Sequence, residues 1–206
     1  MMYDAPLLSL QPDLTFPSRK DSKYETSIAQ RLYSGLYELG YARYLAPKYA
    51  KILKTIYSFQ GYDKSVISNS ADVNNDITDI TEISKPQAAK RNRLDWRGFL
   101  NAVPDLENYT GLPITHSVNM TGTGLAILRM DNKKIYTSVD YGKYGGGHGH
   151  PDRLNLNLFI NGRRWLSDWG TCNYYLEHLK WYRSTIGHNT LVVDCSDQLP
   201  VDGKCV

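Results

Sequence analysis

The most regular alternation of apolar and polar positions runs from residue 154 to residue 160. Leucine or isoleucine stands at every second position from Leu154 to Ile160, which is the period of a strand with one buried apolar face. Asn161-Gly162 follows and favours the left-handed dihedral angles of a two-residue hairpin turn. The pattern therefore predicts a β-hairpin whose second strand covers residues 163–169.

A two-residue turn also fixes the register of the predicted hairpin. Ile160 is then expected opposite Arg163, and Leu158 opposite Trp165. Asn155 falls opposite Asp168, which places Asp168 on the polar face of the hairpin. The segment that contains His148 and His150 enters the first strand at the same open end, so the hairpin brings two histidines and a carboxylate together.

Shorter apolar runs on both sides of the hairpin predict further strands. The runs at 116–120, 124–130 and 134–139 are separated by Gly, Asp and Asn, which indicates an antiparallel meander leading into the hairpin. The run 191–193 is predicted as another strand. His116 stands alone in its run and is interpreted as structural.

Helical spacing of apolar residues marks the first part of the chain instead. The pattern predicts a helix that starts at Asp21-Ser22 and stops before Pro47, with Pro47 as the first-turn proline of a second helix. Residues 1–21 carry three prolines and are expected to be extended. Residues 61–93 are polar and rich in breakers and predict a surface loop, with a short helix near 95–101 closing this part.

The predicted fold class is therefore α+β. Residues 1–107 form a helical part with its polar loop near 61–93, and residues 108–206 form an antiparallel β domain.

Composition narrows the possible partners. The net charge of +3 over 206 residues is too small to indicate nucleic acid, but it is compatible with an acidic sugar. The three cysteines have neither the even number nor the spacing of a disulfide framework or a zinc knuckle. No apolar run reaches membrane-spanning length. The 16 tyrosines offer stacking faces, although helix packing accounts for most of them.

Two residues at the end of the predicted hairpin, together with His188 just before the strand predicted at 191–193, are candidate metal ligands if that strand lies beside the hairpin. His150, Asp168 and His188 offer two imidazoles and one carboxylate, a set that suits zinc. The alternative is that these histidines only form ordinary hydrogen bonds. The run 145–147, three glycines, favours a functional loop, because it lets backbone or ligand approach closely just before His148.

The residues around these candidates resemble a known family. GGGHGHPDRLNLNL, LSDWG and WYRSTIGHNTLVVD, in this order and spacing, are similar to motifs of heparinase II/III-like polysaccharide lyases of the alginate lyase and heparin or heparan sulfate lyase type. The resemblance is densest over residues 122–194. It implies the end of an incomplete (α/α) toroid followed by a partial antiparallel β-sandwich, and cleavage of polysaccharides that contain uronic acid by β-elimination.

The resemblance also implies roles for single residues. His148 matches the histidine at the active-site cleft, and His150, Asp168 and His188 match zinc ligands that brace the β domain. Tyr182 lies where some members place an active-site tyrosine, a position for which Tyr174 and Tyr175 compete. Tyr175 and Arg183 are candidates for contact with the substrate. Core and surface packing is the competing interpretation of 181–183.

Elimination needs a neutralised uronate carboxylate, a base for the C5 proton and an acid for the leaving oxygen. His148 and Tyr182 are the candidate catalytic residues in this chain. The family's main tyrosine base, and the asparagine and histidine that neutralise the carboxylate, have no match here, so the chain is expected to be a piece of a longer protein and to be inactive alone. The resemblance implies a bacterial protein with a periplasmic or secreted location. A carbohydrate-binding domain without catalysis and a metal-dependent glycan hydrolase remain alternatives.

Overall fold

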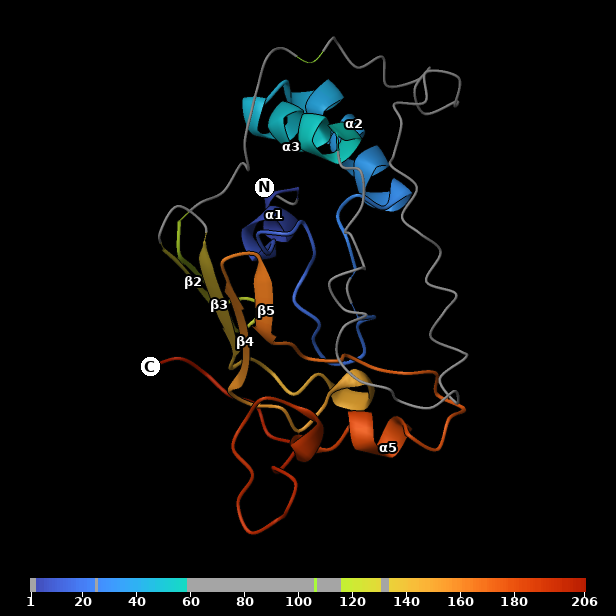
Figure 1. The fold of residues 1–206 in the computed structure, drawn as a ribbon, viewed down its shortest axis with the longest axis vertical. Helices are drawn as coiled ribbons and strands as arrows, with labels where there is room; N and C mark the ends of the chain where they lie inside the picture. The colour runs from blue at the N-terminus through green and yellow to red at the C-terminus, as the bar shows by residue number, and fades with distance from the viewer. Residues whose placement is uncertain (1–2, 25, 59–105, 107–115, 131–133) are drawn as a thin grey trace. The chain divides into compact units, whose positions relative to one another are not determined.

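The computed structural model describes residues 3–24, 26–58, 106, 116–130 and 134–206. The chain forms two compact units, one made of residues 1–26 together with 114–206 and the other of residues 27–113. No helix in the described ranges combines the length and the apolar character needed to cross a bilayer. Figure 1 shows the elements in chain order: α1 (Asp4–Ser9), α2 (Arg31–Tyr44), α3 (Pro47–Ser58), β1 (Val118–Met120), β2 (Leu125–Met130), β3 (Ile135–Asp140), η3 (Gly146–His148), β4 (Asn155–Ile160), β5 (Arg163–Leu166), α5 (Leu179–Tyr182) and η4 (Thr185–Gly187).

The second unit contains the helix pair α2 and α3. Leu45 ends α2 in the left-handed region, and Pro47 is the first residue of α3, as predicted. The helix starts at Arg31 and not at Asp21, because residues 21–26 belong to the other unit. The rings of Tyr37 and Tyr49 pack at 6.1 Å within the pair, which supports the packing interpretation of the tyrosines. The predicted loop 61–93 and short helix 95–101 lie outside the described residues.

The other unit is built on one antiparallel sheet whose strands follow chain order from β1 to β5. This confirms the predicted meander and the hairpin that it leads into, and the chain is therefore α+β. The predicted strand at 191–193 is wrong. Its backbone forms only an isolated bridge between Val193 and Ser196, and a strand needs a neighbouring ladder to pair with.

The register of the hairpin is confirmed near the turn and shifts beyond it. Ile160 pairs with Arg163 as expected, but Leu158 pairs with Leu166 and not with Trp165, because a bulge lies between Leu158 and Phe159. The extra residue on the return strand moves every later position by one. The strand β5 then ends at Leu166, so Asp168 reaches Asn155 through a side-chain hydrogen bond and not through the ladder.

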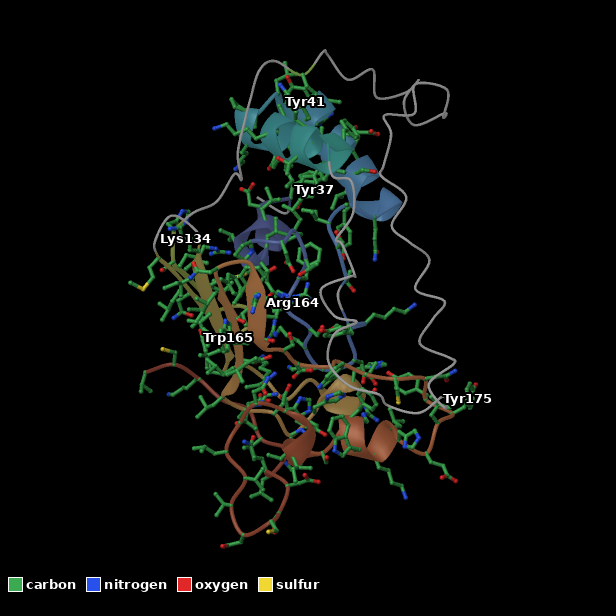
Figure 2. The ribbon with its side chains drawn as sticks, viewed as in Figure 1. Tyr37, Tyr41, Lys134, Arg164, Trp165 and Tyr175 are labelled. Carbon is green, nitrogen blue, oxygen red and sulfur yellow. The ribbon has the colours of Figure 1, made fainter. Side chains whose placement is uncertain are left out.

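Residues 3–24, the N-terminal strap, cover one face of this sheet. The Arg129 guanidinium donates to the carbonyl oxygens of Leu8 at 2.7 Å and Leu10 at 3.0 Å. Arg164 on β5 forms an ion pair with Asp13, and Figure 2 shows Arg164 on this strand. The strap is thus fixed to the sheet by polar contacts spread along its length.

The covered face carries the core cluster of Leu125, Ile127, Tyr136 and Phe159, but in β4 it also buries the two asparagines, which corrects the predicted orientation of that strand. Asn155, Asn157 and Phe159 are buried, whereas Leu156, Leu158 and Ile160 are half-buried and Leu154 is exposed. The asparagines tolerate burial because their side chains find partners; the Asn157 Oδ1 accepts the Asp168 backbone N–H at 3.0 Å. On the opposite face, apolar side chains of β2 and β5 remain exposed: Leu128, Met130 and Trp165.

The strap also differs from its sequence-based description. Residues 1–21 were expected to be extended, yet Asp4–Ser9 form the short helix α1. These residues were assigned to the helical part of the chain, but they share a compact unit with 114–206. Their contacts with the sheet join residues more than one hundred positions apart, and a local sequence pattern does not predict such contacts.

Tyr136 tests the attachment of the strap to the sheet. Its buried hydroxyl donates to the Ser9 carbonyl oxygen at 3.0 Å, and burial raises its pKa to about 12. We expect Tyr136→Phe to lower the free energy of unfolding by about 1 kcal/mol, because it removes this bond and leaves a carbonyl without its donor. Urea denaturation followed by circular dichroism measures the change. Tyr141→Phe, at a more exposed hydroxyl, is the control and should change stability by less than about 0.5 kcal/mol.

Candidate functional site at the histidine loop

The loop between β3 and β4 presents its two histidines in opposite ways. Gly145 and Gly146 have positive φ angles of 94° and 64°, and a Cβ on Gly149 would collide with the Tyr144 carbonyl oxygen. Glycine is therefore required for this path of the backbone. The result is a His148 side chain that is 79% exposed and a His150 side chain that is 0% exposed.

His188 and Asp168 meet in the interior beside His150. The Nδ1 of His188 lies 2.7 Å from Oδ2 of Asp168, and the rings of His150 and His188 are 5.1 Å apart. The Asp168 carboxylate also accepts the Gly170 backbone N–H at 2.6 Å and the Asn155 amide. The structure thus brings together the three residues that the sequence grouped, with Asp168 held by donors on both oxygens.

Several buried polar atoms at this point have no hydrogen-bond partner among the described residues. They are Nδ1 of His150, Nε2 of His188 and Oδ2 of Asp152. A buried polar atom without a partner is costly, and nitrogen and carboxylate oxygen are atoms that bind zinc. Atoms of these kinds can bind a metal ion.

The acidic residue Asp152 belongs to this group as well. One ligand atom each from Asp152, Asp168 and His188 lies within 4.8 Å of the others, and all three residues are buried. This group could hold a metal ion. It contains Asp152 where the sequence-based set has His150, so the binding of one ion by His150, Asp168 and His188 remains a prediction. The H-x-H-P-D sequence was the available signal for Asp152.

The electrostatics of the buried group follow from burial and from its carboxylates. Burial raises the pKa of the Asp152 carboxyl and lowers the pKa of the His150 imidazole. Burial also lowers the pKa of His188, but the hydrogen bond to Asp168 and the charges of Asp168 and Asp152 together outweigh burial, and the net shift is upward. A bound cation would oppose protonation of both imidazoles and favour ionised Asp152.

His148 faces a second, exposed cluster. Its Nδ1 lies 2.7 Å from Oδ2 of Asp21 and 3.1 Å from the Tyr174 hydroxyl oxygen. The Asp21 carboxylate also accepts the Tyr174 hydroxyl and lies 3.5 Å from the Arg183 guanidinium, which in turn donates to the Gly147 carbonyl oxygen. A histidine, a tyrosine, an arginine and a carboxylate therefore meet at the surface.

The other predicted site residues lie differently. Tyr182 is half-buried with its ring edge on Trp181 at 5.2 Å, burial raises its pKa, and it makes no hydrogen bond to His148 in the described part of the chain. Tyr175 is 95% exposed and lies away from the strands (Figure 2). Tyr174 is therefore the tyrosine that the structure brings to His148, and the roles of Tyr182, Tyr175 and Arg183 remain predictions.

Asp21 was missed by the sequence analysis. It lies 127 positions before His148, and its surroundings in the sequence carry no motif. Nothing in the local pattern distinguishes it from an ordinary helix start. Tyr174 was noticed only as a competitor of Tyr182.

Comparison with protein families places this site in a known context. The model of the family "Heparinase II/III-like, C-terminal" matches residues 113–204, which include the histidine loop and His188. An alginate lyase of Stenotrophomonas maltophilia is 37% identical over 83 residues, covering 34% of this chain and 11% of the relative. An exo-oligoalginate lyase of Saccharophagus degradans is 43% identical over 61 residues, covering 24% of this chain and 8% of the relative. The chain thus spans about a tenth of the length of these relatives.

Solved structures resemble the chain in fold. Heparinase III matches with a TM-score of 0.55 at 14% identity, over 95% of this chain and 26% of that protein. A heparan sulfate lyase from Pedobacter heparinus matches with a TM-score of 0.50 at 17% identity, over 95% of this chain and 24% of that protein. The helices and the five-stranded sheet therefore correspond to part of the heparinase III fold.

Proposed function

We propose that residues 113–204, a heparinase II/III-like C-terminal domain, serve a polysaccharide lyase that cleaves a uronic-acid-containing polysaccharide by β-elimination. The observation that carries the proposal is the exposed His148, which sits with Tyr174 and Arg183 inside the region that the family model matches. The alginate lyases among the relatives support an acidic polysaccharide as the substrate class.

The proposed roles follow from the chemistry of elimination. The C5 proton of a uronate becomes acidic when the adjacent carboxylate is neutralised, and a nearby base then removes it while the O4 bond breaks. His148 is proposed to transfer a proton or to stabilise charge at the exposed end of the loop. Arg183 is proposed to meet the substrate carboxylate, and in the structure its charge is shared with Asp21 at 3.5 Å. Tyr182 is proposed as a second catalytic residue, and Tyr175 is proposed to contact the substrate.

Zinc is proposed as the ion of the buried group, with a structural role. The available donors are imidazole nitrogens and carboxylate oxygens, which zinc accepts. Bound zinc would supply a crosslink between the histidine loop and the segment that carries His188. Hydrogen bonds to Asn155 and His188 hold Asp168 in place beside the ion, so the ion would orient the loop without itself taking part in the reaction.

The proposal extends to the architecture and the location. We propose that α2 and α3 are the end of an (α/α) toroid and that the sheet is one layer of a β-sandwich, as the family resemblance implies. A periplasmic or secreted location belongs to the same proposal.

The test is a search for the product of elimination. Elimination leaves an unsaturated uronate that absorbs in the ultraviolet, so incubation of the full gene product with alginate, heparan sulfate and related polymers should raise absorbance for at least one substrate. The assay uses the 206-residue chain and, in parallel, the full gene product that contains it. Oligosaccharides without this absorbance would indicate a hydrolase, and binding without any product would indicate a carbohydrate-binding domain.

A matched pair of variants assigns the activity to the site. His148→Ala should reduce the rate about 100-fold or more, the range lost when a general acid or base is removed. His178→Ala replaces an exposed histidine outside the loop and should leave the rate unchanged. Equal rates for both variants and the unchanged protein would remove His148 from the mechanism.

A further inference from the structure

We infer that Asp21 of the N-terminal strap is the positioning residue for both histidines of the loop, fixing the tautomer of His148 with one carboxylate oxygen and the orientation of His150 with the other. Oδ2 lies 2.7 Å from Nδ1 of His148, and Oδ1 lies 3.0 Å from Nε2 of His150. The role in catalysis rests on the function proposed above, whereas the effect on the imidazoles does not.

The groups around Asp21 favour the ionised form of its carboxyl group. Its side chain is 10% exposed, and it is surrounded by the Tyr174 hydroxyl, the Arg183 guanidinium and the two imidazoles. Oδ2 also accepts the Tyr174 hydroxyl and lies 3.5 Å from the Arg183 guanidinium, so donors and a positive charge surround the carboxylate. An ionised carboxylate only accepts hydrogen bonds, so its partners must donate to it.

This constraint decides which nitrogen of His148 carries the proton. With Nδ1 donating to Asp21, a neutral His148 keeps its proton on Nδ1 and leaves the Nε2 lone pair free. Because the side chain is 79% exposed, Nε2 is available to a group that arrives from solvent. An aspartate that orients a histidine in this way is the arrangement known from Ser-His-Asp triads.

The other oxygen has the matching effect in the interior. With Nε2 of His150 donating to Asp21, the remaining Nδ1 is the buried nitrogen that has no partner among the described residues. Carboxylates that hold the second nitrogen of a histidine set the tautomer and the ring orientation in this manner. One side chain of the strap therefore sets the state of an exposed and a buried imidazole together.

Imidazole nitrogen chemical shifts test the inference without any substrate. In the 206-residue chain, two-bond nitrogen–hydrogen NMR correlations recorded while the imidazoles are neutral should show His148 protonated on Nδ1. Asp21→Asn replaces the carboxylate by an amide of the same shape, and His148 should then change to the Nε2-protonated form that a solvent-exposed imidazole prefers. The His148→Ala spectrum assigns the signals.

The control is Asp13→Asn, the same substitution in the same strap. Asp13 pairs with Arg164 and does not contact the histidines, so the His148 signals should stay unchanged although the strap loses an ion pair. Changes of equal size in both variants would show that a loosened strap, and not the Asp21 carboxylate, is responsible. If Asp21→Asn does not fold, the unchanged chain still decides, because an Nε2-protonated His148 there overturns the inference.

The kinetic test separates the positioning role from the lyase proposal. On the gene product that makes unsaturated uronate, Asp21→Asn should lower kcat about 10- to 100-fold, the size typical of lost outer partners of functional histidines, with little change in KM. An unchanged kcat would end the catalytic part of the inference. A gene product that makes no unsaturated uronate would refute the lyase proposal and leave the NMR result standing.

Discussion

Zn²⁺ added to chelator-treated chain is expected to raise its melting temperature, and Asp168→Ala is expected to abolish this rise. A ligand that binds only the folded state stabilises it by about 2.7 kcal/mol at a concentration 100 times its dissociation constant. Asp168 is buried against His188 at 2.7 Å and belongs to the group whose ligand atoms lie within 4.8 Å of one another. Its loss removes a carboxylate of the site and frees the His188 ring.

The same substitution should weaken the metal-free chain. Removing one partner from a buried charged pair costs about 3–5 kcal/mol, and the Asn155 amide and the Gly170 N–H also lose their acceptor. Calorimetry with and without Zn²⁺ separates the two effects. Glu177→Ala, at an exposed carboxylate, should keep both the stability and the response to Zn²⁺. A melting temperature that Zn²⁺ leaves unchanged in the unsubstituted chain would contradict the metal proposal.

Gly124→Ala is expected to lower the free energy of unfolding by more than about 3 kcal/mol. Gly124 precedes β2 with a φ of +65°, and a Cβ there would collide with the backbone of Gly142. The colliding atoms are main-chain atoms, so no side chain can move aside. The Gly124 carbonyl also accepts the Tyr141 N–H at 2.8 Å, and displacement of this turn would break that bond.

Gly162→Ala is the matched control for this substitution. Gly162 also has a positive φ, +82°, but a Cβ there would meet open space. Gly162→Ala should lower the free energy of unfolding by only about 1–2 kcal/mol, the cost of placing a residue with a Cβ in the left-handed region. Urea denaturation of both variants measures the difference. Equal losses would show that the close approach of the two glycines does not matter.

Local features of the sequence predicted local features of the fold. Asn161-Gly162 marked the turn, Pro47 marked the start of a helix, and the alternation of residues marked the strands. These signals work because turn dihedrals, first-turn prolines and side-chain period depend on neighbours in the chain. The bulge beside Leu158 was not predicted, because it depends on how the two strands pair and not on the sequence of one strand.

The covering of the sheet could not be predicted in the same way. Alternation shows that β4 has two unlike faces, but not which one another segment covers. Here the face of β4 with Asn155 and Asn157 is buried, together with Asp140 of β3, which pairs with Arg19 of the distant strap at 2.7 Å. A prediction from apolar character alone buries the opposite face of β4, which carries Leu156, Leu158 and Ile160.

The candidate site was predicted in part for the same reason. The hairpin grouped His150 with Asp168, whereas His188 was added through a strand at 191–193 that the structure does not form. Predicting that Asp152 joins this group would have required knowing the backbone path of the glycine-rich loop before it. Asp21 lies beside the histidines only because the residues before the helices pack on the sheet, and no periodic pattern in the sequence predicts that packing.

The discontinuity of the unit that holds the sheet also bears on how such proteins can be cut and recombined. A deletion that keeps only residues 113–204 would preserve the family motifs yet strip off the first 26 residues, and with them the partners of Asp140, Arg129 and His148. Exchanging the helical unit between related proteins would meet the same boundary: the sheet must keep its own leading segment, because residues 27–113 are inserted between the two parts of one compact unit.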